Sequence, residues 1–530
     1  MSRRRSLWAW GWADKLPPRE PLAQLARAML PAAEPVLATL PPDEPEVAAP
    51  RVAVPPELAA IASQEPRDRA AHARGRAWPD QLAGLAGDFA GAPDVVVRPR
   101  DAADIARVLA VADARGWAVV PFGGGTSVVG GVDAAAARAH HLGSRAAGHD
   151  REALLSLDLA ATAGVHEVDA TSRLARIGAG TFGPELEVAL AAHGLTLRHF
   201  PQSFEHSTLG GWLATRAGGH YATGATHIDD FCHAVTLVTP RGELATHRHP
   251  ASGAGPEAAR LVLGSEGALG VIAEAWMRVV PRPQHRASAS FAFARFDDGV
   301  AAARALAQSG LMPSNCRLLD AAEARLHRVR FDGKAVLLVG FESADHAMTA
   351  WLARALELAR DCGGELATGP TEVSTAGEAG TWRQAFFDAP YLQSALLSIG
   401  VLSDTFETAC TWTAFPELHA RVTAAVTDAL AREAGGGLVS CRFTHVYPDG
   451  PAPYYTFVGA RASLGAWRAI KAAASDALAA AGGTITHHHA VGRTHLGHYA
   501  RERSPRFADA LTAIKRTLDP NSIMNPGVLL

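Results

Sequence analysis

Apolar positions in the first half of the chain alternate between short continuous runs and helix-spaced stripes. Residues 95–97, all valine, are typical of a buried strand, and Asp101 is a suitable N-cap for a helix with one apolar face. A second apolar run at 117–120 predicts the next strand. This β-α-β start places the following loop at the carboxyl end of a strand, where ligands bind in open α/β structures.

The same patterning continues to residue 280 and then starts again. Pro281-Arg282-Pro283 breaks it and indicates a domain boundary. Before the break we expect strands at 154–159, 174–177 and 271–280, a helix at 183–193 and a hairpin at 234–244. After it we expect strands at 287–294 and 335–341 and helices at 299–308, 344–361, 416–433, 464–481 and 504–518. Residues 13–57 read as loops and short helices packed on a later domain, and residues 135–150 as an exposed insertion.

The composition is that of a globular protein without a strong charge. The 530 residues include 48% hydrophobic and 19% charged residues, and the net charge of −3 gives no reason to expect a nucleic-acid partner. Five scattered cysteines without a Cys-x-x-Cys pair argue against a disulfide framework and suit a reducing cytosol. No apolar run is long enough to span a membrane, and the N-terminus lacks the apolar core of a signal peptide. We therefore expect a cytoplasmic protein.

The strand at 117–120 leads into a glycine-rich loop, residues 121–131. Its glycines lack the Cβ atoms that would hold a ligand away from the backbone, so consecutive N–H groups can converge on an anion. The loop is not a P-loop, because no lysine follows Gly125, and not a Rossmann fingerprint, because position 128 is valine. A purely structural glycine turn stays open at this point.

The glycine loop and three other stretches, taken together, resemble the vanillyl-alcohol-oxidase (PCMH-type) family of FAD-binding proteins. The other three are residues 207–211, residues 264–272 and the terminal Asn525-Pro526-Gly527. More of the chain is similar to one branch of that family, the alkyldihydroxyacetonephosphate synthases. The segments that carry this closer resemblance are 204–217, 238–242, 317–320, 405–408, 441–444 and His487-His488-His489 with the following Val491-Gly492.

The resemblance implies an α+β fold in which a two-subdomain FAD-binding domain carries an α/β cap. We expect an N-terminal extension at 1–85, the FAD-binding domain at 86–282, the cap or substrate domain at 283–482, and a C-terminal segment at 483–530 that returns to the flavin. FAD is expected to bind non-covalently, because no histidine lies beside Thr126 and Ser127, where relatives with covalent FAD often carry one. The residues expected to contact FAD are Pro121, Phe122, Gly123, Gly124, Gly125, Thr126, Ser127, Gln202, Ser203, Phe204, Glu205, His206, Ser207, Thr208, Thr215, Arg216, Ala217, Gly218, Glu266, Gly267, Ala268, Leu269, Gly270, Val271 and Ile272.

The chemistry that the resemblance implies belongs to ether-lipid biosynthesis: an acyl group is exchanged for an alkyl group through a flavin N5 adduct. The substrate, an acyl ester of dihydroxyacetone phosphate, loses a C1 proton as the fatty acid leaves. These steps need a base, electrostatic help for the departing carboxylate and a phosphate anchor. By resemblance the catalytic residues are Tyr454, Arg317, His487, His488 and His489.

Each of these residues also has a plain structural interpretation. Tyr454 lies in an apolar alternating strand and could be a core tyrosine; as a base it would need Arg317 or the histidines to lower its pKa. On a strand, His487 and His489 would face one side and His488 the other. The triplet could bind zinc, but no carboxylate or cysteine lies nearby at ligand spacing, and we predict no metal. Arg317 could be only a surface ion-pair partner.

One position departs from the family pattern. In the helix before residue 405, Gln393 stands where the family carries the arginine that binds the substrate phosphate. A neutral amide cannot replace the charge of an arginine fork. Either Arg383 or another cation compensates, or the substrate is not a phosphate ester. We expect Gln393 to lie in the substrate site.

Two other functions stay open from the sequence. One is an FAD-dependent oxidoreductase that acts on a 2-hydroxy acid or another alcohol, and the other is a flavin-binding subunit without catalysis of its own. The expected partner is a small-molecule or lipid-like substrate. A homodimer and peripheral contact with a membrane through an apolar patch of the cap are left open.

Overall fold

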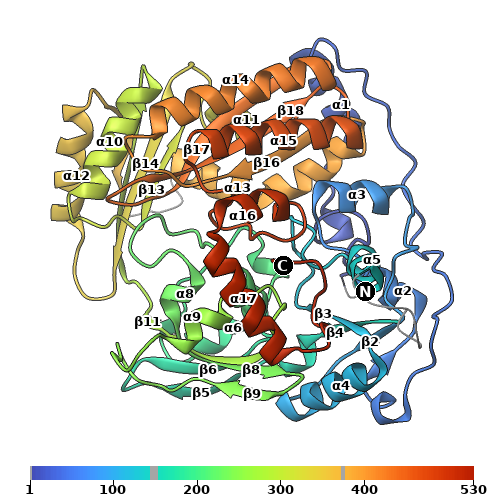
Figure 1. Cartoon of the computed structure of the whole chain (residues 1–530). Helices are drawn as coiled ribbons and strands as arrows, with labels where there is room; N and C mark the ends of the chain where they lie inside the picture. Colours follow the sequence, from blue (N-terminus) through green and yellow to red (C-terminus); the bar gives the residue numbers. More distant parts are fainter. Residues whose placement is uncertain (1–2, 144–152, 372–376) are drawn as a thin grey trace.

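Two halves, one above the other in Figure 1, make up the computed structural model, which describes residues 3–143, 153–371 and 377–530. The lower half holds a four-stranded sheet in the order β1 (Ala62–Ser63), β2 (Val95–Val97), β4 (Leu154–Asp158), β3 (Ala118–Phe122). Strands β2 and β3 both run parallel to β4, on either side of it. The predicted β-α-β start is confirmed, with β4 inserted between its two strands.

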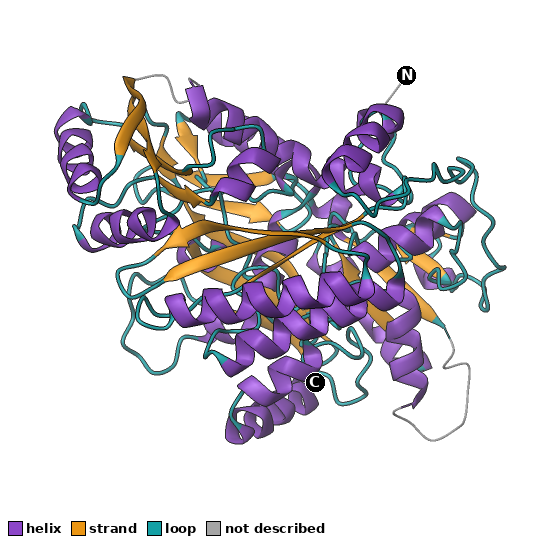
Figure 2. Cartoon of the chain, turned by 90° about the horizontal axis from the view of Figure 1, so that it is seen from above, coloured by secondary structure: helices purple, strands orange, loops and turns teal. Residues whose placement is uncertain are grey.

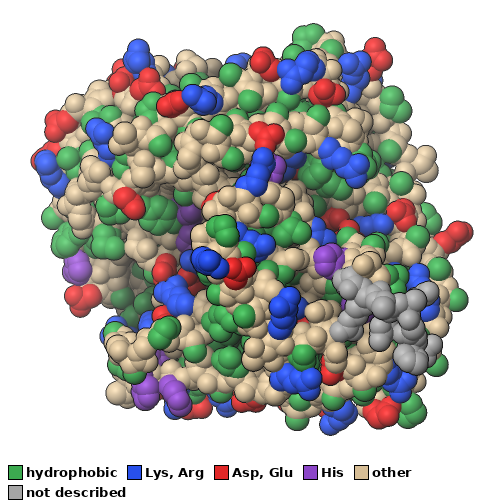
Figure 3. Space-filling view, viewed as in Figure 1, with side chains coloured by type: hydrophobic (Ala, Val, Ile, Leu, Met, Phe, Trp, Pro, Cys, Tyr) green, Lys and Arg blue, Asp and Glu red, His purple; other side chains and the backbone are tan. Residues whose placement is uncertain are grey.

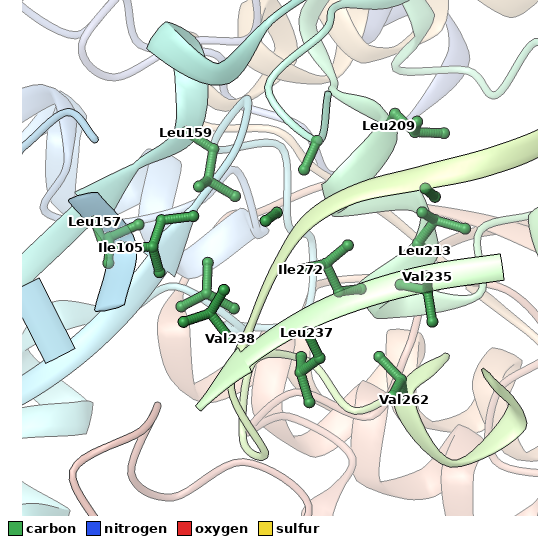
Figure 4. Close-up of a cluster of buried hydrophobic side chains, with 14 of the residues drawn as sticks. Ile105, Leu157, Leu159, Leu209, Leu213, Val235, Leu237, Val238, Val262 and Ile272 are labelled. Carbon is green, nitrogen blue, oxygen red and sulfur yellow. The ribbon is translucent and has the colours of Figure 1, made fainter. Parts of the chain in front are cut away.

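Helix α4 (Ala102–Arg115) connects β2 to β3 and begins where the predicted Asp101 cap places it. The Asp101 side chain accepts a hydrogen bond from the backbone N–H of Asp104 at 2.8 Å, and Gly116 ends the helix with a φ of +67°. In Figure 4 Ile105 of α4 lies against Leu157 of β4, within the largest buried cluster of the lower half.

A second, antiparallel sheet completes the lower half. Its order is β5 (Val165–Asp169), β6 (Leu174–Gly178), β10 (Val271–Arg278), β8 (Cys232–Thr239), β9 (Gly242–Ala245). The predicted hairpin is β8 and β9, and the predicted helix is α6 (Gly183–Ala191). The pattern missed α7 (Leu209–Thr215), because two glycines in seven residues leave no apolar stripe.

The upper half is a seven-stranded antiparallel sheet with helices packed on it (Figure 2). The strand order is β15 (Glu365–Thr371), β12 (His285–Phe293), β14 (Ala335–Ser343), β13 (Asn315–Leu319), β17 (Gly437–Val446), β18 (Pro451–Gly459), β16 (Leu402–Glu407). The helices are α10 (Phe296–Gln308), α11 (Ala321–Leu326), α12 (Thr349–Asp361), α13 (Gly377–Leu397), α14 (Phe415–Glu433) and α15 (Leu464–Ala480). No helix among the described residues is long and apolar enough to cross a membrane.

Both ends of the chain pack against parts distant in sequence. Helix α1 (Arg19–Met29) buries alanines against Ile399, Val401 and Val458 of the upper half. Helix α17 (Pro505–Leu518) crosses the lower half in Figure 1, and the tail after it runs beside β3. There the backbone N–H of Val119 donates to the carbonyl oxygen of Ile523 at 2.8 Å. The C-terminal segment thus packs against the lower half, and its predicted contact with the flavin stays a prediction.

The expected exposed insertion at 135–150 is partly wrong. Helix α5 (Ala134–Gly143) buries Ala134, Ala137 and His141, and the two alanines pack against β3 and β4. Alanine gives a weak apolar signal, which explains the error. The remainder of that segment, from 144, lies outside the described residues.

Candidate cofactor and substrate site

A continuous cavity lies between the two halves of the molecule. The lower half contributes the glycine loop and the segments around 201–219 and 265–272, and the upper half contributes β13, β16, β17, β18 and α13. The outer surface in Figure 3 is hollowed between the same two halves, and histidine side chains are visible in the hollow.

The glycine loop forms the lower wall of the cavity. Among the described hydrogen bonds, the backbone N–H groups of residues 123–128 donate to no protein acceptor. A Cβ on Gly124 would lie 1.8 Å from the carbonyl oxygen of His206, so this glycine also permits the close packing of two loops. The loop is therefore a tight structural turn whose unpaired amides would fit a diphosphate, and its contact with a phosphate stays a prediction.

Arg76, which the sequence analysis missed, lies beside this loop and lines the same cavity. Its backbone N–H donates to the carbonyl oxygen of Ser127 at 2.6 Å, and its buried guanidinium leaves Nε without a partner. Burial lowers the pKa of Arg76 to about 10, which leaves it charged at neutral pH. A buried cation next to free amides is a second feature that fits the phosphates of FAD.

Most residues predicted to contact FAD line the cavity. They are Pro121, Phe122, Gly123, Gly124, Gly125, Thr126, Ser127, Gln202, Ser203, Ser207, Thr208, Thr215, Ala217, Gly218, Glu266, Gly267, Gly270 and Ile272. Their contact with FAD stays a prediction. The predicted residues that do not line it are Phe204, Glu205, His206, Arg216, Ala268, Leu269 and Val271.

The residues outside the lining have other partners that explain their orientation. Glu205 accepts a hydrogen bond from Trp12 Nε1 at 2.7 Å, and the His206 ring centroid lies 5.1 Å from that of Trp12, so both face the N-terminal segment. His206 Nε2 also lies 3.0 Å from the hydroxyl of Tyr391 on α13. Burial lowers the pKa of His206 to about 4. Arg216 pairs with Asp229 at 3.0 Å. They were predicted from motifs of which only some residues line the cavity.

Glu266 holds the C-terminal segment against the cavity. Its carboxylate accepts the backbone N–H groups of Val491 at 2.9 Å and Gly492 at 2.8 Å, while Asn525 Nδ2 donates to its carbonyl oxygen at 2.7 Å. Burial raises the pKa of Glu266 to about 7 against the lowering effect of these hydrogen bonds. Glu266 therefore positions the segment that follows the histidine triplet.

Tyr454 lies on β18 at the upper wall of the cavity. Its hydroxyl donates to Thr405 Oγ1 at 2.9 Å, and the Arg442 guanidinium lies 3.8 Å from its ring centroid. Burial raises the pKa of Tyr454, and the lowering effects of Arg442 and Thr405 do not outweigh it. The cation beside Tyr454 is therefore Arg442 on β17, whereas the sequence suggested Arg317 or the histidines.

The histidine triplet lies in an irregular turn, so the alternation expected for a strand is wrong. Glu407, at the end of β16, accepts the backbone N–H groups of His487 at 2.6 Å, His488 at 3.2 Å and His489 at 3.0 Å. Burial raises the pKa of Glu407, but the neighbouring imidazoles and the Thr486 hydroxyl have a larger, opposite effect. The pKa of Glu407 therefore lies below its ordinary value. His488 and His489 line the cavity, and the predicted residue His487 lies behind His488, outside the lining.

Ring nitrogens of His445, His487 and His488 lie within 4.8 Å of one another, close enough to hold a metal ion. They also have hydrogen-bond partners in the protein: His445 Nε2 lies 3.1 Å from the carbonyl oxygen of Gly219, and His487 Nε2 lies 2.8 Å from the Tyr447 hydroxyl. Burial lowers the pKa of all three rings, to about 3 for His487. Neutral, hydrogen-bonded rings account for this cluster, and the absence of a metal stays a prediction.

Arg317 is a buried cation rather than a surface residue. It lies on β13 with 1% of its area exposed, lines the cavity, and donates from one nitrogen to the carbonyl oxygen of His220 at 2.6 Å. Its Nε and other terminal nitrogen have no partner, and no ion pair of Arg317 occurs within the described residues. Burial, and then the nearby Arg442, lower the pKa of Arg317 to about 9. Such a cation lacks the counter-ion that burial normally requires.

Gln393 also lines the cavity, but protein groups occupy its amide. Its Nε2 donates to Asp404 Oδ1 at 2.9 Å, and Lys471 Nζ lies 3.8 Å from Asp404 Oδ2. Arg383, offered from the sequence as compensation, is exposed and outside the cavity lining. The cations that reach the cavity from the upper half are Arg317, Arg442 and Lys471.

Other lining residues were missed as well, and of these Trp10 has no local pattern that marks it. Trp10 reaches the cavity from the N-terminal segment, held by its backbone N–H to Ser394 Oγ at 2.9 Å. Thr405 and Arg442 lay within motifs that carried the resemblance, so those motifs were the signal that could have identified them.

Comparisons with known proteins agree with this geometry. Residues 93–247 match a family model described as an FAD binding domain, and residues 282–529 match one described as the C-terminal domain of FAD linked oxidases. The chain therefore belongs to the FAD-dependent flavoproteins with a PCMH-type fold that pair these two domains.

Within that class the chain resembles the alkyldihydroxyacetonephosphate synthases. The enzyme of that name from Dictyostelium discoideum is 27% identical over 474 residues, which cover 84% of this chain and 74% of the relative. A solved alkyldihydroxyacetonephosphate synthase structure superposes with a TM-score of 0.73 at 24% identity, covering 95% of this chain and 92% of that one. A mitochondrial D-lactate dehydrogenase [cytochrome] from Arabidopsis thaliana is 25% identical over 458 residues, 83% of this chain and 73% of the relative.

Proposed function

We propose that the chain exchanges an acyl for an alkyl group on a phosphate ester of dihydroxyacetone, with FAD as its cofactor. The observation that carries the proposal is the unpaired Arg317 guanidinium in the same cavity as Tyr454, His488 and His489. A buried cation without a counter-ion is stabilised by an anionic ligand, and a substrate phosphate supplies one. Because the Gln393 amide already donates to the Asp404 carboxylate, we place the anionic group of the substrate at Arg317, with Arg442 adjacent.

The side chains around Arg317 suit the rest of the reaction. When bound, FAD supplies an electrophilic ring system that no side chain of the protein provides. A neutral His488 can accept the C1 proton, and Tyr454, kept protonated by burial, can donate a hydrogen bond to the departing carboxylate. His489 borders the Tyr454 ring, with their centroids 5.4 Å apart.

An apolar part of the cavity suits a long-chain acyl or alkyl group. The apolar side chains that line it from the upper half are Leu326, Phe386, Leu392, Leu396 and Val458. Burying methylene groups of a lipid chain contributes about 0.8 kcal/mol each. This supports a lipid-like rather than a purely polar substrate.

A second candidate function is the oxidation of a 2-hydroxy acid. Arg317 would bind a carboxylate as well as a phosphate, and the neutral Gln393 removes the phosphate-binding arginine that the resemblance leads us to expect. The similarity to the D-lactate dehydrogenase relative fits this alternative.

Label exchange separates the two functions. The FAD-loaded protein is incubated with acyl-dihydroxyacetone phosphate and a radiolabelled fatty acid, and label entering the ester is measured. We expect exchange in the wild type, a loss of about 10- to 100-fold in kcat/KM in Arg317→Gln because charge-assisted hydrogen bonds disappear, and no loss in the exposed control Arg383→Gln. A loaded protein that shows no exchange but is bleached by D-lactate under nitrogen would replace this proposal with the second candidate.

Cytoplasmic localisation is part of the same proposal, supported by the scattered free cysteines. A homodimer and peripheral membrane contact remain predictions from the sequence, and gel filtration and vesicle flotation of the loaded protein test them.

A further inference from the structure

A chain of hydrogen bonds leaves the cavity at His488 and ends at a residue near the surface. His488 Nδ1 lies 3.0 Å from His487 Nδ1, and His487 Nε2 lies 2.8 Å from the Tyr447 hydroxyl. That hydroxyl lies 2.9 Å from Thr226 Oγ1, which lies 3.2 Å from His227 Nδ1. His227 Nε2 in turn lies 2.9 Å from the carbonyl oxygen of His487.

One arrangement of protons satisfies every contact in this chain. The carbonyl oxygen of His487 can only accept, so Nε2 of a neutral His227 carries the proton and its Nδ1 accepts from the Thr226 hydroxyl. Thr226 then accepts from Tyr447, and Tyr447 accepts from Nε2–H of His487. Nδ1 of His487 is left to accept from Nδ1–H of His488, so a neutral His488 has an unprotonated Nε2.

The two ends of the chain suit the uptake and release of a proton. His488 lines the cavity, and among the described residues its Nε2 has no protein partner. His227 is only partly buried, and Tyr447 lines a second, more open cavity beside residues 409–411 and 482–485. Burial lowers the pKa of His487 to about 3 and holds that of His488 well below its ordinary value, so neither ring retains an extra proton.

We propose that His488, His487, Tyr447, Thr226 and His227 form a proton relay from the substrate cavity to the surface. The inference rests on the proposed function, which requires a base for a C–H proton. Nε2 of His488 takes that proton, and the electron pair of the C–H bond stays on the substrate. His488 passes its Nδ1 proton to His487 Nδ1, and His487 passes its Nε2 proton to the Tyr447 hydroxyl. Tyr447 passes its own proton to the Thr226 hydroxyl, and Thr226 passes its own to His227 Nδ1. His227 becomes an imidazolium and releases a proton to water, so exactly one proton leaves the site.

Glu407 is the competing acceptor, because its carboxylate lies 3.7 Å from His488 Nδ1. It already accepts three backbone N–H groups and the Thr486 hydroxyl. The neighbouring imidazoles, and then the Thr486 hydroxyl, keep its pKa low although burial raises it. A carboxylate stabilised in this way is a poor proton acceptor. The relay through Tyr447 offers the exit that Glu407 does not.

Thr226 provides a matched pair of variants, because Thr226→Val removes only the hydroxyl from a side chain of the same shape, whereas Thr226→Ser keeps it. Thr226 and Tyr447 do not line the cofactor cavity, so flavin content should match the wild type in every variant. We expect Thr226→Val and Tyr447→Phe to lower the exchange rate by about tenfold or more and to change the solvent deuterium isotope effect, while Thr226→Ser retains both wild-type values. Equal rates and isotope effects in the Val and Ser variants would overturn the relay.

A second measurement does not depend on turnover. In protein labelled with ¹⁵N-histidine, with signals assigned by single substitutions, we expect His488 as the Nδ1–H tautomer and His487 and His227 as Nε2–H tautomers. Thr226→Val should alter the His227 signal. Different tautomers, or stoichiometric Zn²⁺ binding to His445, His487 and His488 in chelator-treated protein, would overturn the relay. Wild-type protein that shows no exchange but has the expected tautomers would instead count against the proposed function.

Discussion

Glu407 holds the histidine triplet in place, and replacing it offers a sharp test of how the site is built. Its Oε2 accepts the backbone N–H of His487, while Oε1 accepts those of His488 and His489 and the Thr486 hydroxyl at 2.6 Å. In Glu407→Gln one oxygen becomes an amide NH₂ that cannot accept. Placed at the Oε2 position, the NH₂ would face the His487 N–H donor to donor.

The expected cost follows from the bond that is lost. A hydrogen bond to a charged group contributes about 1.5–3 kcal/mol, so we expect Glu407→Gln to destabilise the folded protein by about 2–3 kcal/mol. For a cooperative unit of 150–250 residues this corresponds to a fall of about 4–12 °C in the thermal midpoint. An exposed carboxylate in an ion pair provides the control: Glu417 pairs with Arg421 on the surface of α14, and Glu417→Gln should change the midpoint little.

The pH dependence has a definite sign. The pKa of Glu407 is lower in the folded than in the unfolded state, so its stabilising contribution is present above the ordinary glutamate pKa and is lost as pH falls below it. Calorimetry at pH 7 and near pH 3 should therefore show a large midpoint difference between wild type and Glu407→Gln at pH 7 and a smaller one at low pH. A difference that is equal at both pH values, or no larger than that of Glu417→Gln, would refute this account of the triplet.

Two further predictions concern the lower wall of the cavity. Gly124→Ala should destabilise the protein by about 1–3 kcal/mol and lower the flavin-to-protein absorbance ratio, because the new Cβ meets the backbone of His206. The control Gly465→Ala, at the start of α15, should leave stability and absorbance ratio unchanged. Equal flavin content in Gly124→Ala and the wild type would contradict the packing described for this loop. Burial raises the pKa of Glu266 to about 7, so raising the pH from 5 to 8 should lower the thermal midpoint of the wild type relative to that of Glu266→Gln. If the midpoints of the two proteins changed in parallel with pH, Glu266 would not ionise within the fold.

The sequence was most informative where a local pattern determines local structure. The apolar runs at β2 and β3 and the Asp101 cap predicted the β-α-β start, and the glycine loop lies where that start places it. The resemblance indicated the residues that line much of the cavity, because short motifs retain the backbone geometry that a large planar cofactor needs.

The orientation of side chains and the contacts between residues distant in sequence could not be predicted from the sequence. The triplet was expected on a strand, because nothing near it in sequence shows that Glu407, some eighty residues earlier, gathers its amides. Arg442 reaches Tyr454 through the register of β17 and β18, and His206 turns toward Tyr391 rather than the cavity. Such contacts depend on strand register and on packing between distant segments, which a single sequence does not specify.

The central claim is that this cavity binds FAD and uses it without net oxidation of the substrate. The most direct test is an absorbance spectrum of the purified protein under nitrogen during titration with acyl-dihydroxyacetone phosphate and then with D-lactate. We predict a yellow protein whose flavin D-lactate does not bleach, while acyl-dihydroxyacetone phosphate exchanges its labelled fatty acid. Colourless protein that takes up no added FAD, or flavin that D-lactate reduces in the absence of any exchange, would contradict the account.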